Sequence, residues 1–220
     1  MATWLSLVND LQKRLRESET ASVNTDAYST LLGSLVNKAK REIEDKHDWT
    51  ALRTILSFNT TSGTATYTIT GSNERSRFYE PTKILYDDTN DGLIFPAPDS
   101  FIDNVTYIGT TQISAPSYYR MRGISSGLLQ ITLYPTPDGT YTIRVPMLVP
   151  QAELAANATT LTIPTAPVLE RAYALALIER GEDGGTTSIQ AGKDAESAFA
   201  EARIHDLTNM HDDEVMWKVV

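Results

Sequence analysis

The sequence changes from a helical pattern to a strand pattern at Trp49, and this change constrains the fold more than any single residue. Before it, apolar residues recur at helical spacing along one face of a charged segment: Leu31, Leu32, Leu35, Ala39 and Ile43. After it, apolar residues alternate along a strand and, beyond a turn at Ser62-Gly63, along a second one: Leu52, Leu56, Phe58, then Ala65, Tyr67 and Ile69. The pattern predicts an amphipathic helix that leads through an aromatic hinge into a β-hairpin.

Helical patterns occupy both ends of the chain. Helices are expected at residues 3–17 and about 26–46, with Asn24, Thr25 or Asp26 as the cap of the second. A third helix after Pro164 is apolar nearly all round, which is typical of a helix inside an assembly of helices. The last helix, residues 187–210, carries small and aromatic residues on one face: Ala191, Ala195, Ala198, Phe199 and Ala202. These four helices predict one bundle closed from both chain ends.

The middle of the chain is rich in Thr, Tyr, Ile and Val and is interrupted by Gly, Pro, Asn and Asp, which predicts antiparallel β structure. A second hairpin is expected, with strands around residues 129–133 and 141–147 and a turn at residues 135–139. Weaker strands are expected at residues 83–87, 93–95, 118–122 and 160–163, and one or two helical turns at 99–107.

The predicted fold class is therefore α+β, a helical bundle from both chain ends with an inserted antiparallel β region. The predicted domains are residues 1–52 plus 165–210 for the bundle, 53–164 for the β-rich insertion, and 211–220 for a C-terminal arm.

Composition excludes several classes of function. The chain of 220 residues has no cysteine, which rules out disulfides and thiolate chemistry. The net charge of −9 opposes a sequence-independent grip on DNA, which needs a basic surface. Nine acids against Lys193, Arg203 and Lys218 make residues 182–220 especially acidic. No secretory signal or membrane span is recognisable, so assembly in a cytoplasm is expected.

No catalytic, cofactor-binding or metal-binding residues are predicted. His205 and His211 are six positions apart, whereas a helical zinc pair prefers a spacing of four. His47 is interpreted as a cation near a helix C-terminus. Neither a nucleophile elbow nor a phosphate loop occurs. The protein is expected not to be an enzyme, although a site of scattered carboxylates between subunits stays a minor hypothesis.

The aromatic residues suggest interfaces. Tyr67, Tyr134 and Tyr141 suit packing on the sheet, or contact with a partner. Tyr118 and Tyr119 cannot both point inward from one strand.

Beyond the acidic stretch the chain ends in an apolar tip. This tip either folds back on its own helices or forms an arm that docks on another protein. The candidate arm residues are Val215, Met216, Trp217, Val219 and Val220.

Three segments together resemble bacteriophage head–tail adaptor proteins, also called tail tubular or head-completion proteins. They are residues 35–49 with the expected hairpin after them, the turn of residues 133–139, and the alanine-rich C-terminal helices. The resemblance covers residues 5–210 and implies a ring, usually of twelve copies, below the portal. It also implies a helical bundle with a β extension, a C-terminal arm that reaches the portal, and a central channel for the genome.

The leading hypothesis is therefore a virion structural protein at the head–tail junction, assembled in the host cytoplasm. Its expected partners are copies of itself, the portal protein, a tail nozzle or hub protein, and double-stranded DNA in transient non-specific passage, with no membrane. The alternative is a tail-associated binding module that recognises a host glycan or another tail protein.

Overall fold

The computed structural model describes residues 2–79, 84–107, 112–181 and 185–215. The chain divides into two compact units. The helical unit comprises Met1–Leu52 and Gln151–Val220, and the β unit comprises Arg53–Pro150.

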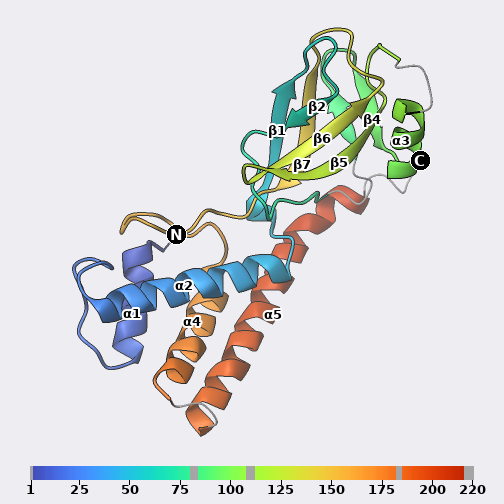
Figure 1. The fold of residues 1–220 in the computed structure, drawn as a ribbon. Coiled ribbons are helices and arrows are strands. Elements are labelled where there is room, and N and C mark those ends of the chain that lie inside the picture. Colours follow the sequence, from blue (N-terminus) through green and yellow to red (C-terminus); the bar gives the residue numbers. More distant parts are fainter. Residues whose placement is uncertain (1, 80–83, 108–111, 182–184, 216–220) are drawn as a thin grey trace. The chain divides into compact units, whose positions relative to one another are not determined.

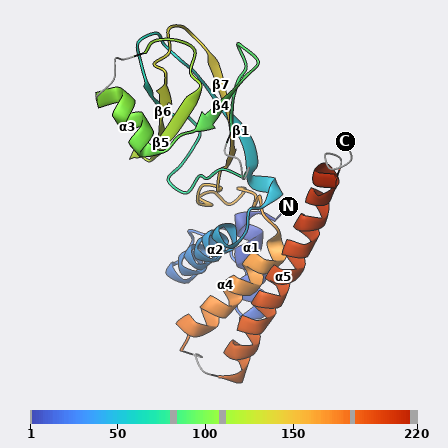
Figure 2. The ribbon, with the colours of Figure 1, turned by 90° about the vertical axis from the view of Figure 1, so that its right-hand side faces the viewer.

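The helical unit contains α1 (Trp4–Arg14), α2 (Ala27–Lys46), α4 (Thr165–Glu179) and α5 (Thr186–Val215), with a short 3-10 turn, η1 (Thr50–Leu52), after α2. The first two helices begin at local caps. Thr3 and Ser6 form a reciprocal capping box at α1, and the carboxylate of Asp26 accepts a hydrogen bond of 2.8 Å from the Ser29 amide at α2. Within this unit α4 packs against α5 and α2, and α1 packs against α2 and α4 (Figures 1 and 2).

The predicted fold class is wrong in one respect, because the helices of the two chain ends do not form a bundle around which the β region is only an insertion. The fold is α+β with five helices, and a seven-stranded curled sheet dominates its middle. The physical reason lies in α5, where the buried side chains among the described residues are Ala191, Ala195 and Asp206. So narrow an apolar stripe packs mainly on α4 and reaches the end of α2 through single side chains such as Phe199 and Asp206, so α5 does not close a four-helix core.

The β unit is one sheet with the strand order β1-β7-β3-β4-β5-β6-β2. The strands are β1 (Arg53–Asn59), β2 (Thr66–Thr68), β3 (Leu85–Asp87), β4 (Gly92–Pro96), β5 (Tyr118–Ser125), β6 (Leu128–Tyr134) and β7 (Thr142–Leu148), and α3 (Asp99–Tyr107) lies between β4 and β5 in the chain. Neighbouring strands run antiparallel except β4 and β5, which are parallel. The inner face of the sheet carries the core: Ile69, Leu85, Ile94, Tyr119, Leu129, Ile131, Leu133, Ile143, Val145 and Met147.

Both predicted hairpins are wrong in their pairing, although their strands exist. β1 pairs with β7 and β2 pairs with β6, so β1 and β2 lie at opposite ends of the strand order. Likewise β6 and β7 belong to different halves of the sheet. The turns reverse the chain, but alternating apolar residues bury equally well against any partner strand, so periodicity alone does not choose the partner. The true hairpins are β3–β4, whose two strands the sequence indicated only weakly, and β5–β6, which joins a weakly indicated strand to a clearly indicated one.

The prediction for the adjacent tyrosines of β5 is confirmed. Tyr119 is 1% exposed within the core, where burial raises the pKa of its phenol, and Tyr118 is 40% exposed on the other face. Tyr67 and Tyr141 pack against the core, whereas the ring of Tyr134 contacts Phe101 of α3 at a centroid distance of 5.8 Å.

Candidate interaction surfaces

The joint at Trp49 is built from α2, η1 and α5. Trp49 is fully buried, and its indole Nε1 donates a hydrogen bond of 2.9 Å to the carbonyl of Ile43. Its ring meets the rings of His47 and Phe199 edge to face, with centroids 4.8 Å and 6.1 Å away. The aromatic hinge that the sequence predicts at Trp49 is thus a buried cluster of aromatic rings, which joins the end of α2 to α5.

Asp206 of α5 holds the same joint through its carboxylate. Its Oδ2 lies 2.9 Å from His47 Nε2 and accepts a hydrogen bond of 3.1 Å from the Thr50 amide, and the Thr50 hydroxyl donates to Oδ1. The sequence predicts that His47 interacts with the dipole at the C-terminus of a helix. In the structure its imidazole contacts the buried carboxylate of Asp206. Asp206 could not be singled out beforehand, because it is one of many acids in an acidic helix.

A buried ion pair on α2 ties down the segment that follows the β unit. Lys40 and Glu44 are both inaccessible to solvent and lie 3.3 Å apart. Lys40 Nζ also donates to the carbonyls of Gln151 (2.6 Å) and Ala152 (3.2 Å), and Glu44 accepts from the Gln151 amide (3.2 Å). Bonds to the backbone satisfy charges that would otherwise be costly to bury.

Asn37, one turn before Lys40, extends this attachment. Its side-chain amide donates to the carbonyl of Leu154 at 3.0 Å, and its side-chain oxygen accepts from the Leu154 amide at 2.9 Å. The second half of α2 therefore holds residues 151–154 in a defined position, and its residue Ile43 also binds Trp49.

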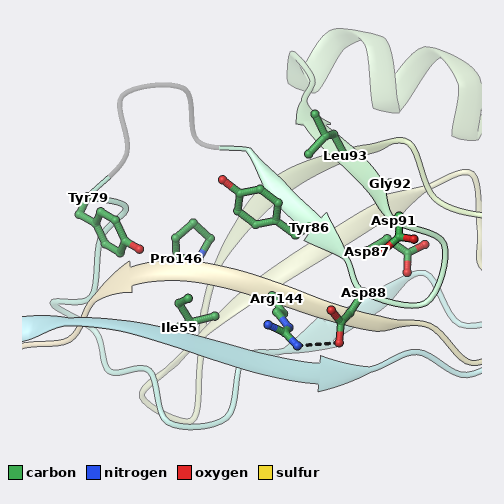
Figure 3. Close-up of a pocket in the computed structure, with 10 residues that line it drawn as sticks. All are labelled: Ile55, Tyr79, Tyr86, Asp87, Asp88, Asp91, Gly92, Leu93, Arg144 and Pro146. Atoms are coloured by element: carbon green, nitrogen blue, oxygen red, sulfur yellow. Dashed lines mark hydrogen bonds and ion pairs between the residues drawn. The ribbon is translucent and has the colours of Figure 1, made fainter. Parts of the chain in front are cut away.

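On the β unit, an open groove of about 440 Å³ lies on the side of the sheet opposite the core (Figure 3). Its floor combines apolar and aromatic side chains from four neighbouring strands and the segment before β3: Ile55, Tyr79, Tyr86, Leu93 and Pro146. Arg144 forms an ion pair of 2.7 Å with Asp88 at one side, and Asp91 lies in the adjoining β3–β4 turn. The groove is therefore apolar at its base and charged at its rim.

The apolar surface continues beyond the groove. Phe95 lies two residues after Leu93 on β4, and its register partner on β5 is Tyr118. Phe101 of α3 contacts Tyr118 with ring centroids 5.5 Å apart. We call this surface the outer apolar face; its members are 39–58% exposed: Ile55, Tyr86, Leu93, Phe95, Phe101 and Tyr118.

A second apolar surface lies on α5. Ile189, Ile204 and Leu207 are 55%, 64% and 40% exposed. At 100° per residue they point opposite to Ala191 and Ala195, which face the rest of the helical unit. Lys193 and Arg203 accompany them. We call Ile189, Lys193, Ala200, Arg203, Ile204 and Leu207 the α5 outer stripe.

The predicted portal-binding arm is only partly within the described residues. Val215 is the last residue of α5, and Met216, Trp217, Val219 and Val220 lie outside the part of the chain that the structure describes. The arm therefore stays a prediction.

The described residues also bear on other classes of site. Among them, no group of three or more metal-ligating side chains could hold an ion. Within the same residues, no helix combines the length and apolar character that a membrane crossing requires.

Exposed apolar faces on a chain of this size are typical of a protein that works within a larger assembly. A sequence profile of the SU10 adaptor protein family matches residues 2–217. The chain belongs to this family of phage head–tail adaptors, so the resemblance of the sequence is confirmed. The protein is accordingly a phage adaptor and a component of the virion. No curated protein matches the chain.

Proposed function

We propose that the protein forms a ring of about twelve copies at the head–tail junction, between the portal and a tail nozzle or hub protein. Membership of the adaptor family across nearly the whole chain is the observation that carries this proposal. The twelve-fold number comes from the resemblance of the sequence, and assembly in the host cytoplasm is proposed with it. Such a role is geometric, since each interface positions the next component.

The proposed ring surrounds a channel for the genome. The net charge of −9 supports this, because a like-charged wall repels the phosphate backbone and lets DNA slide during ejection without sticking. The role requires no reaction and no cofactor, and the absence of catalysis stays a prediction.

The C-terminal arm is proposed to grip the portal. The last buried residue of α5 among those described is Asp206, and the helix continues for nine residues to Val215, which is about 14 Å at 1.5 Å per residue, so it can carry the apolar tip away from the helical unit. The tip combines Trp217 with four aliphatic or thioether side chains, Val215, Met216, Val219 and Val220. An aromatic anchor of this kind binds well when a partner supplies a pocket.

Deletion of residues 215–220 tests the arm. We expect a folded, soluble protein that no longer binds purified portal, measured by light scattering of each protein alone and of their mixture. Asp213→Ala, in the acidic stretch before the arm, is the control and should bind as the wild type does. Undiminished portal binding by the truncated protein would refute the arm.

The alternative function, a tail-associated module that recognises a host glycan or another tail protein, has one feature in its favour. The groove of Figure 3 combines Tyr79 and Tyr86 with carboxylates at its rim, and rings with nearby carboxylates suit the stacking and hydrogen bonding of sugars. Binding on a glycan array that Tyr86→Ala abolishes would support this module. No glycan binding, together with a ring on the portal, would exclude the glycan.

A further inference from the structure

We propose that the outer apolar face of one copy binds the α5 outer stripe of a second copy. This inference deepens the proposed function, because it names the two surfaces that join neighbours, and it rests on that function for the presence of several copies at one site.

The outer apolar face is the first observation. On β3, β4 and β5 the residues that point inward, Leu85, Ile94 and Tyr119, are at most 1% exposed, so the core side of the sheet is complete. Antiparallel sheets that face water on one side usually carry polar residues there, whereas sheets that are apolar on both faces are covered on both. Tyr86, Leu93 and Phe95 occupy the water-facing positions instead. Their pattern indicates a surface that another protein covers.

The α5 outer stripe is the second observation. Ile189, Ala200, Ile204 and Leu207 share the side of α5 that points away from its own unit, at spacings of three, four and eleven residues. A helix that only had to pack on α4 would carry polar residues there. The stripe is narrow and rigid, as is typical of a helix that lies in a groove.

Charge supplies the reason to pair these two surfaces with each other. Lys193 and Arg203 are the only Lys or Arg residues on α5, both lie in the stripe, and neither forms an ion pair with a described residue. Glu196 lies close to them, but Lys46 holds it at 2.7 Å. In a chain with a net charge of −9, both charged members of this stripe are therefore positive.

The outer apolar face has carboxylates at two ends. Asp91 lies in the β3–β4 turn beside Leu93 and forms no ion pair among the described residues. Asp99 begins α3 near Phe101, with a side chain that is 77% exposed and 3.9 Å from Arg120. Apolar centres with opposite charges at their margins are complementary, and such charges select the partner and the register.

The two surfaces differ, so each copy offers one and receives the other. Passed from each copy to the next, such a contact is heterologous and closes into a ring when the rotation between neighbours is a simple fraction of a turn. A head-to-head dimer, in which one surface pairs with itself, is excluded by this arrangement.

The absence of cysteine from the chain allows a direct test. Leu93→Cys and Ile204→Cys are made as separate proteins, mixed with purified portal present, and treated with a short thiol–thiol cross-linker. We expect the yield of cross-linked dimers in the mixture to be about tenfold higher than in either variant alone. A tenfold ratio corresponds to about 1.4 kcal/mol, which one modest contact supplies. Ile178→Cys, 50% exposed on α4, replaces Ile204→Cys in the control mixture and should give only the background. Dimers of Leu93→Cys with itself at the level of the mixture would overturn the proposal.

A second pair of variants tests the contact by mass. Leu93→Glu disables the face and Ile204→Glu disables the stripe, and both positions are exposed, so unfolding midpoints should equal that of the wild type. Each variant alone should lose the ring on the portal. Their mixture retains one usable contact per pair and should give dimers by light scattering. Rings from both variants on the portal would overturn this inference and leave the proposed function standing.

The remaining outcome separates the two proposals. Cross-linking between Leu93→Cys and Ile204→Cys without any ring of the wild type on the portal would contradict the proposed position in the virion and support the contact. Neither a cross-link nor a ring would overturn both.

Discussion

The carboxylate of Asp206 lies 2.9 Å from the imidazole of His47, across 159 positions of sequence. This contact joins the second half of α5 to the residue that ends α2, beside the buried Trp49. The C-terminal end of α2 and the second half of α5 are therefore held together by direct side-chain contacts.

Asp206→Ala should destabilise the protein. The change removes the acceptor of the Thr50 amide and hydroxyl and a carboxylate that contacts His47, and loss of a partner from buried donors costs about 1–3 kcal/mol. Urea unfolding measures the difference. Glu201→Ala, at an exposed position on the same helix, is the control and should change stability by at most about 0.5 kcal/mol. Equal stability of the two variants would show that the joint does not depend on this carboxylate.

Lys40→Met should be among the most damaging single substitutions. It removes the ammonium group that lies 3.3 Å from the buried Glu44 carboxylate, and removing one partner of a buried ion pair costs about 3–5 kcal/mol. The double variant Lys40→Met with Glu44→Leu should lose less than the sum of the single losses, because both changes remove the same contact.

Lys38→Met serves as the matched control, since Lys38 is exposed on the same helix. Its free energy of unfolding should stay within about 0.5 kcal/mol of the wild-type value. Additive losses in the double variant would contradict a coupled pair.

Gly33→Ala and Gly192→Ala should have opposite effects, although both glycines lie within helices. A Cβ at Gly33 would come within 2.5 Å of Val23 Cγ1 and 2.8 Å of Trp4 Cζ2, so α2 could not keep its approach to α1. We expect overpacking to cost about 1–3 kcal/mol there. A Cβ at Gly192 meets nothing within 4 Å, and the better helix propensity of alanine should stabilise by up to about 1 kcal/mol. Thermal unfolding measures the expected loss of stability in Gly33→Ala and the expected gain in Gly192→Ala. A stabilised Gly33→Ala would disprove the close approach of α2 to α1.

Asp26 should make the stability of α2 dependent on pH. The Ser29 amide, and then the Ser29 hydroxyl, hold the pKa of the Asp26 carboxyl below its usual value of 3.8. A lowered pKa means that the contribution is complete above 3.8 and is lost as the pH falls through the lowered value, because the folded state then has to take up a proton. Asp26→Asn keeps a cap but removes the titrating group.

Urea unfolding of both proteins at neutral pH and below pH 3.8 measures the effect. The wild type should lose more stability on acidification than Asp26→Asn does. Parallel losses in the two proteins would assign the acid sensitivity to other carboxylates.

The candidate surfaces were only partly visible in the sequence. The alternation of Tyr118 and Tyr119 correctly indicated one exposed ring on β5. The outer apolar face was not predicted, because Tyr86, Leu93 and Phe95 come from strands whose pairing is non-local, and alternation does not tell which side of a two-sided apolar strand is the core. Lys40 looked like an ordinary solvated lysine, since its carbonyl partners lie more than a hundred residues away.

Local features follow from the amino-acid sequence alone: the helices and the Asp26 cap, the change from helix to strand at Trp49, the existence of most strands, and membership of the adaptor family. These depend on side chains a few residues apart, which a periodic pattern records. Only the folded chain reveals which strands pair, that α5 closes no four-helix core, and which charges are buried. Those outcomes depend on which of several distant segments packs on a given apolar surface. A local pattern of apolar residues does not record such long-range competition.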